Sequence, residues 1–170
     1  YRVNIVGDQE RMKLGIMNGD VTWGNVALTG LELAKQAEKE GKVKTAVIPW
    51  PGDINSHTMM FNFLTPDATK GKIINDIRFR RAMSLAMPRD QMNQLFYQGL
   101  VRTKQIGISD PTNAWYNEKL AKSYVSYDLD GANKLLDEMG LSKKDKDGFR
   151  LAPDGSALAF SLVTMQGWDK

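Results

Sequence analysis

The sequence contains no cysteine and only one histidine among its 170 residues. Without cysteine, the chain forms no disulfide and performs no thiolate chemistry, an absence that is compatible with any cellular compartment. No apolar run approaches the roughly 20 residues that a helix needs to span a bilayer. With 42% hydrophobic residues, the chain is long enough for one ordinary core and short for two.

Residues for catalysis or metal binding are also scarce. His57 directly follows Ser56, but neighbours in sequence do not form a catalytic triad, and the chain has no Gly-x-Ser-x-Gly motif. The spaced His, Cys and carboxylate ligands of a zinc site are missing. Asp145-Lys146-Asp147-Gly148 lacks the other ligands of a calcium loop, and Gly71-Lys72 lacks the rest of a phosphate-binding loop. We therefore expect no enzyme activity, no metal and no cofactor.

Charge of one sign is not concentrated anywhere in the chain. The net charge is only +3, and Lys143 and Lys144 lie close to Asp145 and Asp147. A nucleic-acid-binding surface needs clustered positive charge, so we expect no nucleic-acid partner. The basic run from Arg78 to Arg81 is interpreted as the solvated side of a helix.

The most informative stretch is residues 75–98, which predicts two consecutive helices. An Asn/Asp cap opens the first helix, and Pro88 ends it because proline lacks the backbone N–H but suits the first turn of a new helix. The second helix is expected to stop at Gly99. The apolar positions that we expect to be buried are Ile77, Phe79, Ala82, Met83, Leu85, Ala86, Met92, Leu95 and Phe96.

The rest of the chain mixes strand and helix patterns without an internal repeat. Helices are expected from the Gly7-Asp8 cap to Asn18-Gly19, over 25–39 and over 128–139. Strands are expected at 1–6, 21–23, 43–50 and 58–64, with a hairpin of 149–151 and 158–163 around an Asp154-Gly155 turn. Residues 102–127 are predicted to be long and mostly irregular, which in a compact protein is usually functional or wraps a surface. This pattern favours a mixed α/β or α+β lobe.

The four tryptophans are the remaining candidates for a binding site. Each lies at the end of an expected element or in a loop, where it either caps the core or offers a flat platform in a ligand cleft. Trp23 and Trp168 are the stronger candidates, because each lies where an expected strand passes into a loop and has Asn25 or Asp169 nearby as a polar partner.

Five motifs, in one order along the chain, resemble the family 5 extracytoplasmic solute-binding proteins, which are the peptide- and oligosaccharide-binding subunits of ABC importers. The stretch from Asp76 to Asp90, followed by Gly99-Leu100, is the most recognisable of them. The other four are Met17-Asn18-Gly19-Asp20-Val21, Phe61-Asn62-Phe63 through Pro66, Tyr127-Asp128 through Leu141, and Asp147-Gly148-Phe149-Arg150 with Pro153-Asp154-Gly155. Two departures from the family pattern are Thr22 and Pro88, each where the family often has aspartate.

The resemblance implies a clamshell of lobes of the periplasmic-binding-protein type II kind, with a mixed sheet flanked by helices. Residues 1–170 would form most of one lobe, incomplete at its C-terminal end, within a larger monomeric receptor outside the cytoplasmic membrane. The partners would be a small peptide or oligosaccharide and a membrane permease. Trp23, Trp168, Trp50 and Asn62 would line the cleft. Aromatic platforms favour sugars whereas peptide binding is the larger subfamily, so the ligand class stays open.

Two other classes of function remain as alternatives. A ligand-sensing domain of a transcription regulator with the same fold would have a DNA-binding helix-turn-helix upstream, whereas a transport receptor would have a signal peptide. An enzyme would lose its activity when His57 is replaced by alanine.

Overall fold

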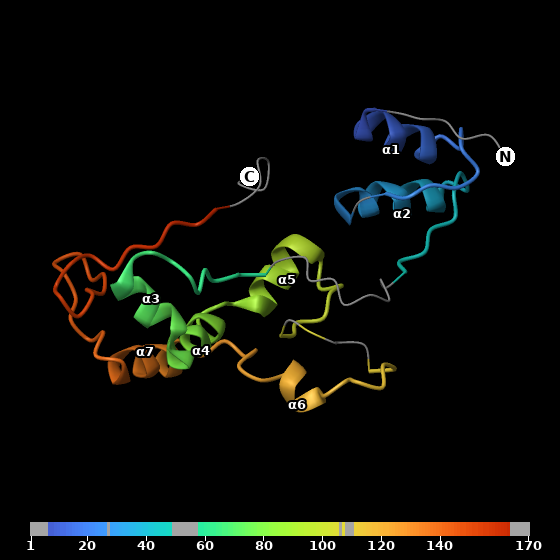
Figure 1. Ribbon diagram of the computed structural model, residues 1–170. Helices are drawn as coiled ribbons and strands as arrows, with labels where there is room; N and C mark the ends of the chain where they lie inside the picture. The colour runs from blue at the N-terminus through green and yellow to red at the C-terminus, as the bar shows by residue number, and fades with distance from the viewer. Residues whose placement is uncertain (1–6, 27, 49–57, 106, 108–110, 164–170) are drawn as a thin grey trace. The chain divides into compact units, whose positions relative to one another are not determined.

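The computed structural model describes residues 7–26, 28–48, 58–105, 107 and 111–163. The chain divides into two compact units, Tyr1–Pro51 and Gly52–Lys170 (Figure 1). Within the described ranges, every helix is too short or too polar to traverse a lipid bilayer.

The first unit is built on two short helices. α1 (Gln9–Met17) begins at Asp8, whose carboxylate accepts a hydrogen bond from Arg11 N at 2.9 Å, and ends at Asn18 as predicted. α2 (Leu31–Lys39) follows a single 3-10 turn, η1 (Leu28–Gly30). The small core of this unit consists of Met17, Ala34 and Ala37, with Val26 and Val43 packed against them.

Three predictions for the first unit differ from the structure. Residues 21–23 form a bend and residues 43–48 form no strand, while 1–6 and 49–50 lie outside the described residues. The helix expected over 25–39 starts only at Leu31, with Gly30 at its N-cap. Glycine has the largest backbone freedom to lose in a helix, which explains why the helix does not extend through this position.

The second unit is helical among its described residues. It contains α3 (Ala68–Asn75), α4 (Ile77–Leu85), α5 (Arg89–Tyr97), α6 (Glu118–Ala121) and α7 (Leu129–Glu138). α4 packs mainly against α7, and the two lie side by side in Figure 1. The core consists of Ile73, Ile74, Phe79, Ala82, Ala132, Leu136 and Leu141.

The predicted helix pair is confirmed. Asp76 starts α4 by accepting hydrogen bonds from Arg78 N at 2.8 Å and from the Arg78 guanidinium. The contact with Arg78 lowers the pKa of the Asp76 carboxyl. Pro88 precedes α5, and the chain leaves that helix through the left-handed residues Gln98 and Gly99.

Asp76 has a second role that the sequence did not suggest. It also ends α3, a helix missed in the sequence, so α3 and α4 are joined through this one extended residue (φ −72°, ψ 124°). α3 begins at Asp67, whose carboxylate accepts a hydrogen bond from Lys70 N at 3.0 Å. Two capping aspartates therefore set the start and the end of α3.

The apolar face of the helix pair is buried only in part. Phe79 and Ala82 are buried, and Met83, Leu85 and Ala86 pack against the core. Ile77, in contrast, is 47% exposed, and α5 buries no residue because Leu95 and Phe96 point to solvent. The prediction is thus correct for most of α4 and wrong for α5.

The expected mixed sheet is not seen in the described residues. Residues 58–64 form no strand, and the hairpin is reduced to the isolated bridge Leu151↔Ala157 around the predicted turn, with a second bridge, Lys144↔Arg150, before it. A strand has no internal hydrogen bonds and forms only beside a partner strand, which the described residues do not supply. The helix predicted over 128–139 is confirmed as α7, with Asp128 at its N-cap and Gly140 (φ +81°) after it.

Candidate functional site

Trp23 lies exposed at the bend that follows α1. The chain leaves α1 through Gly19 (φ +78°), whose N–H donates to Ile16 O at 3.1 Å, and Asp20 N donates to Gly15 O at 2.9 Å. Four residues beyond Gly19, Trp23 is 82% exposed. An exposed indole on a fixed bend is a flat apolar surface with one N–H donor, the chemistry expected of a ligand platform.

Asn62 lies in the second unit, in a turn that is fixed to α3. Its side-chain oxygen accepts a hydrogen bond from Leu64 N at 3.0 Å, and Asn75 Nδ2 donates to Phe63 O at 3.1 Å. The Asn62 amide nitrogen has no hydrogen-bond partner among the described residues. Trp50 and Trp168, the other predicted ligand residues, lie outside the described part of the chain, as does His57.

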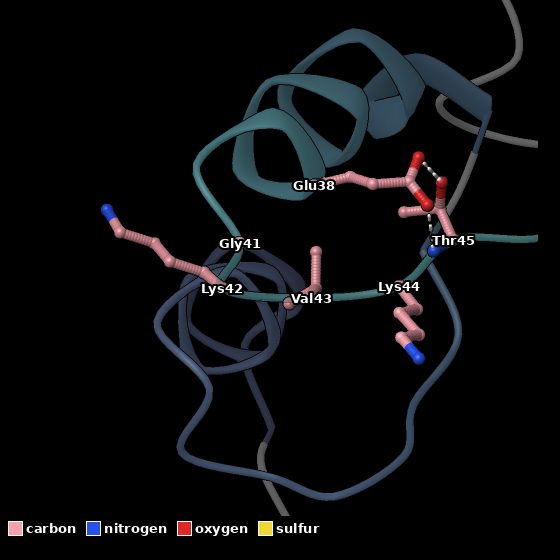
Figure 2. A pocket seen from close by; sticks show the side chains of 6 residues that line it. All are labelled: Glu38, Gly41, Lys42, Val43, Lys44 and Thr45. Carbon is pink, nitrogen blue, oxygen red and sulfur yellow. Dashed lines mark hydrogen bonds between the residues drawn. The ribbon is translucent and has the colours of Figure 1, made fainter.

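A hollow of about 710 Å³ lies beside the end of α2 (Figure 2). Glu38 spans it, because its carboxylate accepts hydrogen bonds from Thr45 N at 2.9 Å and from the Thr45 hydroxyl at 2.6 Å. The side chains of Lys42 and Lys44 point away from Glu38 in different directions (Figure 2). A ligand site needs polar groups that converge on the ligand, so this hollow is better explained as the place where the chain folds back on α2.

The Glu38 carboxyl has the largest pKa change that the structure indicates. Its pKa is lowered to about 2, first by the hydrogen bond from Lys35 and then by the two hydrogen bonds from Thr45. A carboxyl whose pKa is lower in the folded state contributes stability above its unfolded pKa, and this contribution disappears as the pH falls through the folded pKa.

We expect acidification from pH 4.5 to pH 2 to loosen the contact between α2 and Thr45. Hydrogen exchange of the Thr45 amide should accelerate across this window relative to the intrinsic rate, and replacing Glu38 with glutamine should weaken the pH dependence. Glu32→Gln, in the first turn of the same helix, is the control and should leave the pH dependence of Thr45 exchange unchanged. An equal pH dependence in wild type and Glu38→Gln would contradict this assignment.

Three arginines of α4 have partners that the sequence did not reveal. Arg80 Nη1 donates to Ile74 O at 2.8 Å and its guanidinium lies 5.2 Å from the centre of the Phe63 ring. Arg81 lies 4.9 Å from the centre of the Tyr124 ring, and Arg78 Nη1 donates to Glu138 O at 2.9 Å. The prediction of a solvated basic face is therefore wrong, because each arginine is partly buried and ties α4 to a neighbouring segment.

The described residues contain no cluster of His, Cys, Asp or Glu suited to a metal ion. Among them, Trp23 offers an exposed apolar surface.

A family model described as "Bacterial extracellular solute-binding proteins, family 5 Middle" matches residues 2–170. The chain therefore belongs to family 5 of the bacterial extracellular solute-binding proteins. Its fold is of the periplasmic-binding-protein type.

Two relatives give this membership more detail. The chain is 30% identical over 165 residues to a probable ABC transporter-binding protein of Deinococcus radiodurans, a match that covers 96% of this chain and 27% of the relative. It is similar in structure to the oligopeptide-binding protein OppA, with a TM-score of 0.64 and 27% identity over 89% of this chain and 25% of OppA. The chain thus spans about a quarter of the length of the relatives that it matches.

Proposed function

We propose that this chain is part of the substrate-binding component of an ABC importer. The component captures oligopeptides outside the cytoplasmic membrane and delivers them to a permease, without bond chemistry and without a cofactor. The observation that carries this proposal is the continuous family match over residues 2–170, together with the structural similarity to an oligopeptide-binding protein. Capture by closure of lobes around the ligand fits a monomeric receptor of this kind.

Residues 1–170 are proposed to form most of one lobe, in which residues 58–64 and 158–163 would join a mixed sheet only beside partner strands from other parts of the receptor. Phe61 and Phe160 support this assignment, since their ring centres lie 5.7 and 5.3 Å from that of the buried Phe79. The two segments thus approach the same buried core residue.

The ligand class is tested on the full-length protein that contains this segment. Native mass spectrometry of the purified receptor should detect bound peptides of mixed mass, and titration with a random peptide library should release heat. Maltose-type and cellulose-type oligosaccharides are the comparison ligands. Bound sugar in place of peptide would overturn the proposed ligand class, and a receptor that binds neither would overturn the proposed function.

Trp23 is the proposed ligand contact that the structure describes best, and Asn62, Trp50 and Trp168 are the others. Replacing Trp23 with alanine should weaken peptide binding about tenfold, because a buried aromatic contact contributes about 1–2 kcal/mol. Trp115→Ala is a matched control, since Trp115 is 81% exposed and is not among the proposed contacts. Isothermal titration calorimetry measures both, and equal affinities in the two variants would contradict the role of Trp23.

A further inference from the structure

The hydroxyl of Ser84, in the last turn of α4, is the centre of a hydrogen-bonded cluster. It donates to Tyr124 O at 2.7 Å and accepts from Arg89 Nη2 at 2.9 Å and from Gln105 Nε2 at 2.7 Å. A serine hydroxyl has one donor and two acceptor positions, so the whole capacity of this group is used. We call Ser84, Arg89 and Gln105 the neck.

The neck connects the junction of α4 and α5 with residues 121–125, which are distant from it in sequence. Gln105 N donates to Ala121 O at 2.9 Å, and Gln105 Nε2 also donates to Ser123 O at 2.8 Å. Arg89 Nη1 donates to Val125 O at 3.2 Å and to Ser84 O at 2.7 Å. Gln105 and residues 121–125 are therefore held together at one point.

The described residues beyond the neck contribute nothing to the hydrophobic core. Residues 111–120 are exposed except for the half-buried Tyr116, and the core cluster of this unit includes no residue between Ala86 and Ala132. The side-chain oxygens of Asn113 and Asn117 accept local hydrogen bonds, from Trp115 N and Leu120 N. The polar neck thus contributes to the attachment of this segment, whereas burial in the hydrophobic core does not.

Backbone strain at Tyr124, a residue that the neck holds, favours release of the segment. Tyr124 has φ +52°, a conformation that a residue with a side chain adopts at some cost. It is held there by the bond from Ser84 to its carbonyl and by Arg81 over its ring. Partial burial lowers the pKa of Arg89. Arg89 has no carboxylate partner among the described residues, where its guanidinium donates to carbonyl and hydroxyl oxygens.

We propose that residues 111–125 are a separate opening unit of this protein. When the bonds of Ser84 break, residues 111–125 detach together while α3, α4 and α7 remain packed. Regions with few buried apolar contacts and exposed backbone bonds open locally at lower free energy than the core, which gives this unit its independence. The proposal concerns a movement of the segment and does not depend on the ligand.

The test is hydrogen exchange with mass spectrometry on the full-length protein. Ser84→Ala should accelerate exchange of the amides of residues 113–125 about tenfold, because the lost hydroxyl leaves two donors and one carbonyl without their partner. Alanine is the best helix former, so α4 itself is not weakened. Ser126→Ala is the matched control, since this exposed serine has no side-chain hydrogen bond among the described residues.

Gln105→Ala provides the second variant, because it removes the same attachment from the other side of the neck. It should accelerate the same amides, with the exchange of α7 amides unchanged in both variants. The proposal is overturned if α7 accelerates by the same factor as residues 113–125, or if neither variant exceeds Ser126→Ala.

Discussion

Replacing Phe79 with alanine is expected to lower the free energy of unfolding by about 3–5 kcal/mol, the usual cost of deleting a buried aromatic ring. Phe79 is 3% exposed and lies in the middle of the second unit's core. Its ring contacts Phe61 at 5.7 Å and Phe160 at 5.3 Å between centres, so its loss opens a cavity between α4 and the segments that carry these two rings. Urea unfolding of the full-length protein, followed by circular dichroism, measures the change.

Ile77→Ala is the matched control for Phe79→Ala. It removes an apolar side chain from the same helix at a position that is 47% exposed, so its cost should stay within about 1 kcal/mol. Comparable costs for the two variants would mean that the buried face of α4 has been assigned incorrectly.

Replacing Arg150 with alanine is expected to cost about 2–3 kcal/mol of unfolding free energy, because charged hydrogen bonds are lost and their acceptors remain. The Arg150 side chain is only 13% exposed. Its guanidinium donates to Asp137 Oδ1 at 2.5 Å, to Asn133 Oδ1 at 2.8 Å and to Leu141 O. These bonds fasten the bridged segment after Gly148 to the end of α7.

Arg150→Lys separates geometry from charge. Lysine keeps the positive charge but lacks the planar fork that reaches several acceptors at once, so most of the loss should persist. Lys146→Ala, an exposed basic residue nearby, should change stability by less than about 0.5 kcal/mol. Full stability in Arg150→Lys would show that only the charge matters at this position.

The helices with local start and stop residues were predictable from sequence. Asp8, Asp76 and Asp128 each accept a backbone hydrogen bond at the start of a helix, and Gly99 and Gly140 follow helix ends with positive φ. Such caps depend on residues three or four positions apart, so the information is contained in the local sequence. The helix α3 was missed because it directly adjoins α4 without a separating loop.

Features that depend on distant partners were not predictable. Strand patterns at 58–64 and 158–163 indicate extended chain, but a strand also needs a neighbour that sequence spacing does not identify. The contacts of Arg80 with Phe63 and of Arg81 with Tyr124 likewise join residues far apart, so a basic run was mistaken for a solvated face.

The candidate site was predictable only as a residue type. The sequence pointed to tryptophans at element ends, and the structure places Trp23 at an exposed bend. Exposure alone does not distinguish Trp23 from Trp115, since both rings are free of the core. That distinction depends on which ring faces the ligand, so Trp23 stays a prediction that the binding measurements test.

The single residue that separates α3 from α4 fixes the rotational phase of the two helices. A helix turns by about 100° per residue, so one residue inserted beside Asp76 would rotate α4 by more than a quarter turn relative to α3. Phe79 and Ala82 would then leave the core, and the arginines would lose the carbonyls and rings that they contact. This corner therefore tolerates exchange of side chains far better than any change in chain length, and we expect its spacing to be the most rigid constraint on variation in this part of the protein.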